Sequence, residues 1–308
     1  MKNHHARTAH ALALQEPADA GAGEGLVLPS CRRFAMRSDE TGLAYEIFVY
    51  VPDAPLPPSG FPVVYVLDAN SDFVTVAETV RRVARRPRAT GIGPSIVVGI
   101  GYPNTQGYDP DRRYFDFTHG PSACPSGADT PGAACGGQAA YLRVLSEQLL
   151  PYIASHFHAH PHRRTLLGHS LARYFVLEAL ARRPDLFDAC ISFSPSIWWD
   201  REGLRARIAQ GCGTREGLRL YIAAGRYEQE IAPWQAPENF SDAYHEMRAA
   251  RRMVENAREM AGEIEAAFSP DIKVKFELGD KEDHSTVVTT LLCRALRFVE
   301  RPMDEAVF

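Results

Sequence analysis

The sequence predicts an α/β fold: a mostly parallel, twisted sheet with helices on both faces. Short apolar runs and helical patterns alternate along most of the chain, which is typical of strands linked by crossover helices. The runs at 62–67 and 95–100 lack the polar alternation of a half-exposed strand and so indicate strands buried on both faces. The 308 residues suit one large domain, without an internal repeat or a linker. We therefore expect a single domain over residues 31–308, after a weakly ordered tail at 1–30.

The first half of the chain is expected to supply four strands. They are predicted at 44–51, 62–67, 95–100 and 164–167, with helices at about 74–86 and 138–157. The segment from about 102 to 137 is too long for a simple connection in a compact domain. We therefore expect it to form a lid loop that faces the substrate.

The second half continues the alternation. Strands are predicted at 189–193, 218–224 and 272–278, and helices at 171–183, 203–210, 241–268 and 285–300. Sheets of this kind bind ligands beyond the carboxyl ends of their strands, so functional side chains are expected in the loops that follow the strands.

The composition limits the classes of partner. A formal charge of -4 argues against nucleic acid or an anionic membrane surface as the main partner. No apolar run reaches the roughly 18 residues that a membrane-spanning helix needs. The apolar piece at 11–14 is too short for the core of a secretion signal, so we expect a cytoplasmic protein, with a periplasmic one as the alternative. Export would allow a disulfide between Cys124 and Cys135; otherwise both stay thiols.

An apolar run stops and a helical pattern begins within Gly168-His169-Ser170-Leu171-Ala172. A sharp turn from strand to helix leaves its middle residue exposed above the sheet, with the helix N-terminus beneath it. Gly168 lets the turn close, and Ala172 is small enough to lie against the neighbouring strand, although a second glycine is usual there. The pattern predicts Ser170 as a nucleophile, with an ordinary turn as the alternative.

A nucleophilic serine needs a base to take its proton, and a carboxylate usually orients that base. Of the eleven histidines, His284 is the only one in a loop after the last predicted strand, where the base of such folds lies. The carboxylate should follow the preceding strand, and Glu228 does so in a Gly-x-x-Glu turn. Glu230, Asp200 and Asp242 remain alternatives for the acid, as does a Ser-His dyad without one.

Backbone amides must receive the negative charge that develops on an attacked ester carbonyl. In this geometry one donor is the amide after the nucleophile, which is that of Leu171. The second should come from the loop after the strand at 62–67, and we expect it to be Asn70. A simple turn formed by Asp68 and Asn70 is the alternative.

Neither a cofactor nor a metal is predicted. The sequence contains no phosphate-binding glycine loop and no dinucleotide motif. His156, His158, His160 and His162 alternate and could bind a metal with borrowed carboxylates, but they join a helix end to a strand, where cations are favourable without a metal.

Six motifs together carry a family resemblance. They are 65–70 (YVLDAN), 98–103 (VGIGYP), 113–118 (RYFDFT), 168–171 (GHSL), 194–199 (SPSIWW) and 282–284 (EDH). This set resembles the putative-esterase family of α/β hydrolases, in particular its enterochelin-esterase-like and bacillibactin-esterase-like siderophore hydrolases, over about residues 33–299. The resemblance implies an α/β-hydrolase fold, with Ser170 as nucleophile, His284 as base and Glu228 as acid where one is used. It implies as substrate a tri-serine or tri-threonine lactone that carries catecholates.

Ferric catecholate complexes are anionic and flat-faced, so their site should offer guanidinium groups and aromatic rings. Arg112 and Arg113 in the lid could supply the first, and Trp198 and Trp199, after the strand at 189–193, the second. The alternatives are that Arg113 pairs with Asp116 and that one tryptophan packs in the core.

Arg173 departs from the family, which usually has glycine three positions after the nucleophile. Its guanidinium would either swing outward without effect or project toward the active site, where it would repel an imidazolium and block acyl groups. The leading prediction is a serine esterase that acts on a small-molecule ester, with ferric siderophores as the expected substrates. An acyltransferase or thioesterase of the same fold, and a ligand-binding homologue impaired by Arg173, are the alternatives. The sequence predicts no oligomeric state.

Overall fold

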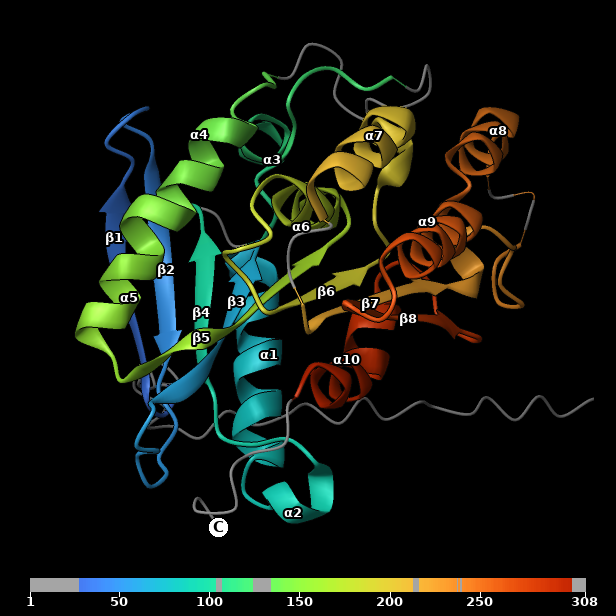
Figure 1. Cartoon of the computed structure of the whole chain (residues 1–308). Coiled ribbons are helices and arrows are strands. Elements are labelled where there is room, and N and C mark those ends of the chain that lie inside the picture. Colours follow the sequence, from blue (N-terminus) through green and yellow to red (C-terminus); the bar gives the residue numbers. More distant parts are fainter. Residues whose placement is uncertain are drawn as a thin grey trace, which may run out of the picture.

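A sheet of eight strands in the order β1-β2-β4-β3-β5-β6-β7-β8 forms the centre of the protein (Figure 1). It is seen in a computed structural model that describes residues 28–103, 107–123, 134–212, 216–236, 238 and 240–300. The strands are β1 (Cys31–Arg37), β2 (Ala44–Tyr50), β3 (Phe61–Leu67), β4 (Ile96–Gly101), β5 (Ala159–His169), β6 (Ala189–Phe193), β7 (Leu218–Gly225) and β8 (Ile272–Gly279). β2 pairs antiparallel with β1 and β4, and every pair from β4 to β8 is parallel. The predicted, mostly parallel sheet is confirmed.

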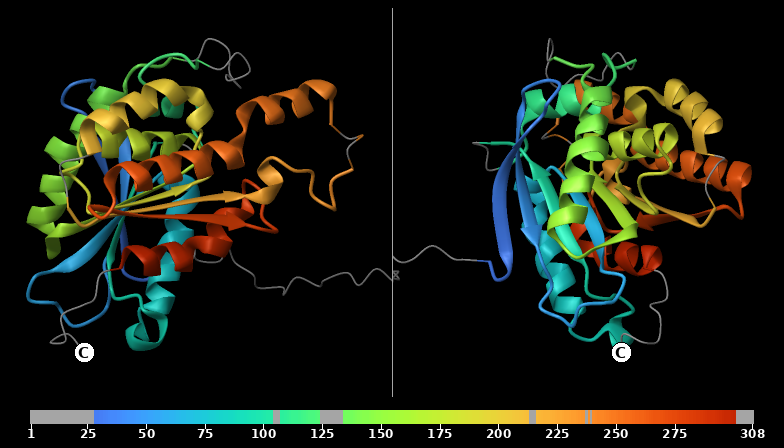
Figure 2. Two further views of the ribbon diagram at one scale, coloured as in Figure 1. Left: turned by 45° about the vertical axis from the view of Figure 1, so that its right-hand side comes forward. Right: turned by 60° about the vertical axis from the view of Figure 1, so that its left-hand side comes forward.

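Helices cover both faces of this sheet (Figures 1 and 2). On one face lie α1 (Ala69–Val83) and α10 (Thr286–Val299), which share a buried apolar cluster with the strands. The other face carries α4 (Gln138–Arg143), η1 (Val144–Leu149), α5 (Leu150–His156), α6 (Leu171–Arg182), α7 (Arg201–Gly211) and α9 (Met253–Phe268). Two apolar cores, one on each face, therefore hold the layers together.

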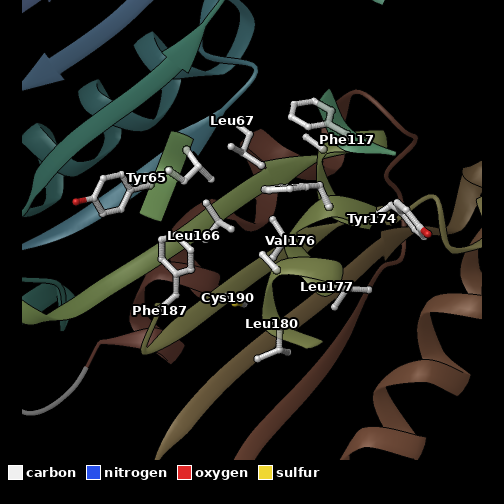
Figure 3. Packing of buried hydrophobic residues seen from close by; sticks show 14 of the residues in the cluster. Tyr65, Leu67, Phe117, Leu166, Tyr174, Val176, Leu177, Leu180, Phe187 and Cys190 are labelled. Atoms are coloured by element: carbon white, nitrogen blue, oxygen red, sulfur yellow. The ribbon is translucent and has the colours of Figure 1, made fainter. Parts of the chain in front are cut away.

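The most deeply buried of these helices is α6. Every residue from Leu171 to Ala181 is buried, and Val176 and Leu180 lie close to Leu166 and Cys190 of the sheet (Figure 3). A helix that is buried on all sides cannot shift without opening a densely packed core. Its N-terminus, directly after residue 170, is therefore a fixed point.

Several elements differ from the sequence-based expectation, and β5 begins at Ala159 rather than at 164. The lid contains a helix, α3 (Pro110–Phe117), which begins where the Asp109 carboxylate accepts a hydrogen bond from the Arg112 amide at 3.0 Å. The helix expected at 241–268 is two helices, α8 (Asp242–Arg251) and α9, because Arg252 adopts a left-handed φ of 42°. β1 was not expected, since this edge strand is largely exposed and lacks an apolar pattern. Further short helices are α2 (Pro87–Thr90), η2 (Ile197–Trp199) and η4 (Arg226–Glu228).

Some predictions concern parts of the chain outside the described residues. These parts include residues 1–27 of the expected tail and Cys124 of the expected disulfide. Within the described ranges, no helix is long and apolar enough to cross a membrane. The same ranges hold no group of three or more histidine, cysteine or acidic side chains placed to bind a metal.

Candidate active site

Ser170 joins β5 to α6 in a strained backbone conformation. Its φ of 62° and ψ of -122° lie in a region that residues other than glycine rarely occupy. The inner side of the turn is tight, since a Cβ at Gly168 would lie 3.0 Å from the carbonyl oxygen of Ala172 and 3.2 Å from its Cβ. The strand, the strained residue and the buried helix together form a sharp strand-to-helix turn (the elbow) with Ser170 at its tip, which is the geometry that the predicted nucleophile requires.

Ser170 lines a cavity of about 520 Å³. The cavity also receives the side chains of Glu228 and His284, and Leu171 lines it beside the elbow. The residues predicted as nucleophile, base, acid and first oxyanion donor therefore surround one space, although they come from three different loops.

His284 and Glu228 are directly hydrogen-bonded. Nδ1 of His284 lies 2.7 Å from Oε2 of Glu228. The Glu228 side chain is 1% exposed and that of His284 is 43% exposed, so the carboxylate lies behind a ring that faces the cavity. Burial would raise the pKa of Glu228, but the charge and hydrogen bond of His284, with two further donors, hold it below its ordinary value.

Those two further donors fix the other carboxylate oxygen. Oε1 of Glu228 accepts from the Gly225 amide at 2.6 Å and from the hydroxyl of Ser194. Glu228 lies in η4 (Arg226–Glu228), the short turn directly after β7. A side chain at position 225 would meet the carbonyl oxygen of Glu282 at 2.4 Å, so only glycine lets the end of β7 approach the His284 loop this closely.

The alternative acids are engaged elsewhere. Glu230 pairs with Arg226 at 3.1 Å, Asp200 caps α7 and pairs with Arg207, and Asp242 lies in the first turn of α8. None of these three carboxylates is among the described residues that line the cavity.

The predicted second oxyanion donor, Asn70, lies near the start of α1. Its side chain is held at both ends by the Tyr102 backbone, with Nδ2 donating to the carbonyl at 3.0 Å and Oδ1 accepting from the amide at 2.7 Å. Asn70 is not among the residues that line the cavity, whereas Leu171 is. Its part in the oxyanion hole stays a prediction.

The four predicted substrate contacts differ in position. Arg113, Trp198 and Trp199 line the cavity, and Arg112 does not. Arg112 donates to the carbonyl of Ala44 in β2 and pairs with Asp116, one turn later in α3.

Arg113 and the two tryptophans also have firm protein partners. Arg113 pairs with Asp68 at 2.9 Å rather than with Asp116. Trp199 is buried and donates to the Gly120 carbonyl, whereas Trp198 is half-buried with the Arg251 guanidinium 4.3 Å from its ring centre. Trp198 is therefore the better placed of the two to present a ring face next to a cation.

The Arg173 side chain takes neither of the two orientations that the sequence suggested, outward or toward the active site. Its side chain is fully buried and does not line the cavity. Nε donates to the carbonyl of Gly168, the guanidinium carbon lies 4.8 Å from the ring centre of Phe193, and Nη1 and Nη2 have no hydrogen-bond partner. Burial lowers the pKa of this guanidinium well below its ordinary value. The side chain therefore lies under the elbow and leaves the space above Ser170 open.

Three features of the site were missed by sequence reasoning. They are Ser194 as a partner of Glu228, His169 as a contact of the His284 loop, and the cavity wall formed by Tyr244, Met247, Arg248 and Arg251 of α8. The spacing of the α8 residues places them on one helix face, which is visible in the sequence. Nothing in the sequence indicates that this face meets the catalytic loops.

Known proteins are similar to this chain in sequence and in fold. Residues 38–265 match the family described as Putative esterase. The ferri-bacillibactin esterase BesA of Bacillus subtilis is 32% identical over 294 residues, which cover 92% of this chain and 94% of that protein. The siderophore enterobactin esterase of Emericella nidulans is 31% identical over 252 residues, or 77% of this chain and 81% of that protein.

Among solved structures, the BES protein from Bacillus cereus superposes with a TM-score of 0.77 at 27% identity, covering 91% of this chain and 98% of that one. The α/β-hydrolase fold expected from the motifs is thereby confirmed. The chain belongs to the putative-esterase family of α/β hydrolases, a family of carboxylic ester hydrolases.

Proposed function

We propose that this chain is a serine esterase that cleaves the ester bonds of a catecholate siderophore trilactone through an acyl-enzyme. The observation that carries the proposal is the hydrogen-bonded pair His284 and Glu228 on the same cavity as the strained Ser170. The names of the two curated relatives, a ferri-bacillibactin esterase and an enterobactin esterase, support the substrate class.

The first half of the reaction follows from the hydrogen-bond pattern. The carboxylate of Glu228 only accepts, so Nδ1 of His284 carries a hydrogen and Nε2 is left as the base. Oγ of Ser170 attacks the ester carbonyl carbon while Nε2 takes the hydroxyl proton. The amide of Leu171, at the N-terminus of α6, donates to the oxyanion, and the amide of Asn70 is proposed as the second donor.

The second half returns the enzyme to its starting state. Collapse of the tetrahedral intermediate breaks the bond to the lactone alcohol, which leaves with the proton held by His284. Water then attacks the acyl group on Ser170 and gives its proton to His284, which passes it to the serine as the carboxylic acid leaves. Each cycle consumes one water and one ester bond, so three cycles convert a trilactone into three linear units.

The cavity wall suits an anionic, aromatic substrate. Arg113, Arg248 and Arg251 bring three guanidinium groups to it, and Trp198 offers a ring face next to Arg251. Catecholates carry negative charge on a flat ring, which matches a surface of guanidinium and indole groups.

The test is mass spectrometry of wild-type protein and the Ser170→Ala variant, each with ferric and iron-free tricatecholate lactones and with simple acyl esters. We expect linear fragments from the lactones with the wild-type protein only, and a fluorophosphonate adduct on Ser170. A folded Ser170→Ala variant that still turns over would refute the proposal. Preferential transfer of the acyl group to an added alcohol or thiol would instead indicate an acyltransferase.

A further inference from the structure

His169 lies between Gly168 and Ser170, and the mechanism proposed above does not use it. It is the last residue of β5 and is 4% exposed. Its Nε2 lies 2.7 Å from the carbonyl oxygen of His284, and its Nδ1 lies 2.8 Å from the hydroxyl oxygen of Tyr108 in the lid. One buried imidazole therefore connects the elbow, the loop of the base and the lid.

These two contacts determine the tautomer of His169. A carbonyl oxygen only accepts, so Nε2 must carry the hydrogen and donate it to the main chain of His284. Nδ1 of the neutral ring is then an acceptor, and the Tyr108 hydroxyl donates to it. Burial, followed by the charge of Arg173 and smaller contributions from His284 and Arg113, holds the pKa of His169 well below its ordinary value. The ring therefore stays neutral next to a histidine that must gain a proton during turnover.

The loop that carries His284 is also held by the start of α10, where Asp283 accepts from the Ser285 and Thr286 amides, and by the end of β7. The Tyr227 amide donates to the Glu282 carbonyl at 3.0 Å, and Glu228 accepts from the His284 ring. Both contacts come from the end of β7. None of these contacts joins the loop to β5, so the Nε2 contact of His169 ties the main chain of His284 directly to the strand that leads to Ser170.

We propose that His169 is a positioning residue that fixes the main chain of His284 and thereby sets the distance between the imidazole and the hydroxyl of Ser170. The inference deepens the proposed serine-esterase function and rests on it. Small errors in the placement of a base are costly, because proton transfer requires hydrogen-bond contact with the nucleophile.

The lid also contacts His169. The guanidinium carbon of Arg113 lies 4.5 Å from the ring centre of Tyr108, and Nη2 of Arg113 lies 3.4 Å from the His169 carbonyl oxygen. Lid residues thus contact both the ring and the main chain of His169.

Three substitutions at position 169 test the proposal with a short acyl ester. His169→Phe keeps a flat buried ring but removes the donor, and we expect kcat to fall by about 10–100-fold with KM changed by less than about threefold. His169→Gln places an amide nitrogen near the site of Nε2, and kcat should stay within about fivefold of wild type. In His169→Asn the shorter amide does not reach the His284 carbonyl, so kcat should fall as in His169→Phe. This variant replaces His169→Phe in the test if the latter does not fold.

A matched control distinguishes the contact made by Nε2 of His169 from the contact made by its Nδ1. Tyr108→Phe leaves the bond to the His284 carbonyl in place, so kcat should stay within about threefold of wild type. A folded Phe or Asn variant with wild-type kcat, or a Gln variant as slow as both, would overturn the positioning role.

A measurement without turnover distinguishes this proposal from the proposed function. The proton on Nδ1 of His284 should give a far-downfield signal in the proton NMR spectrum, which Glu228→Gln would shift and thereby assign. We expect the signal in wild type and in His169→Gln, and its loss by solvent exchange in His169→Phe and His169→Asn. An undiminished signal in both donor-free variants contradicts the positioning role. Lack of ester cleavage by a wild-type protein that shows the signal contradicts only the esterase.

Discussion

Oε2 of Glu228 lies 2.7 Å from Nδ1 of His284, while its Oε1 accepts hydrogen bonds from Ser194 and the Gly225 amide. The carboxylate is therefore held by two contacts that do not involve the imidazole. A buried anion that is oriented in this way fixes the ring tautomer and, in the proposed mechanism, stabilises the imidazolium that forms as the serine attacks.

Glu228→Gln should lower kcat by about 10²–10⁴-fold, because the amide can present a donor where the imidazole needs an acceptor. The variant keeps the size and the other contacts of the glutamate. The measurement is steady-state hydrolysis of a short acyl ester, with circular dichroism to verify the fold. Glu230→Gln, two residues away and paired with Arg226 at the surface, is the matched control and should stay near wild type. Equal loss in both variants would exclude Glu228 as the specific partner of the base.

Ser194→Ala should have a smaller effect of the same kind. It removes one donor to Glu228 but leaves the Gly225 amide, so we expect kcat to fall by about 3–10-fold, in line with the loss of one hydrogen bond to a charged group. The control is Ser192→Ala, which lies two residues earlier and is also buried but has an unpartnered hydroxyl. The measurement is kcat of both variants. A larger loss of kcat in Ser192→Ala than in Ser194→Ala would argue against the role of Ser194.

Arg251→Gln should weaken binding of anionic aromatic esters while leaving neutral ones almost unaffected. Arg251 lines the cavity with its guanidinium 4.3 Å from the ring centre of Trp198, where it would contact a catecholate. We expect KM for a catecholate ester to rise by about 5–10-fold, which corresponds to about 1 kcal/mol. Arg205→Gln removes a surface charge from α7, outside the cavity lining, and should change neither substrate. Equal changes in KM for anionic and neutral esters would contradict the assignment of Arg251 as a contact for the anionic ring.

Asp72→Asn should alter how stability depends on pH. Burial, and then the charge of Asp68, raises the pKa of Asp72 to about 7, although Arg173 and Arg113 oppose this shift. In the unfolded chain an aspartate titrates near pH 4, as an approximate reference. The folded state therefore binds more protons between these values, so the favourable contribution of Asp72 is present at low pH and is lost as the pH rises through about 7.

The free energy of unfolding of Asp72→Asn, relative to wild type, should accordingly rise by on the order of 1–3 kcal/mol between about pH 4.5 and about pH 8. Urea denaturation at both pH values provides the measurement. Asp53→Asn, at an exposed position, is the control. If the free energy of unfolding of Asp72→Asn falls relative to that of wild type as the pH rises, the predicted direction is wrong.

Arg173→Met should raise the free energy of unfolding by about 1–3 kcal/mol, because two buried donors without partners are replaced by an apolar chain of similar length. Since Arg173 does not line the cavity, kcat for a short ester should stay within about threefold of wild type. Thermal unfolding and steady-state kinetics test the two parts. A clear loss of stability would mean that the guanidinium has partners that hold it in place.

The sequence predicted the parallel part of the sheet, and it singled out Ser170, Glu228 and His284, which line one cavity, because strand ends and the sharp turn have local signatures. The break between α8 and α9 depends on one residue, Arg252, that adopts a left-handed conformation under tertiary constraint. Pairing of Arg113 with Asp116 was the alternative to a substrate contact, but the fold brings Asp68 to Arg113 instead. Pairings between distant segments are set by packing, and no pattern within a single segment encodes them.

The position of β8 in the sheet has a consequence for inactivation. β8 pairs only with β7 and forms an edge, whereas β5 has a strand on each side. His284 follows the edge strand and Ser170 follows the central one. Edge strands fray at a lower free-energy cost than central ones. Mild heating should therefore separate His284, the proposed base, from Ser170, the proposed nucleophile, while most of the sheet persists, and hydrolysis would cease at a temperature below the melting of the protein.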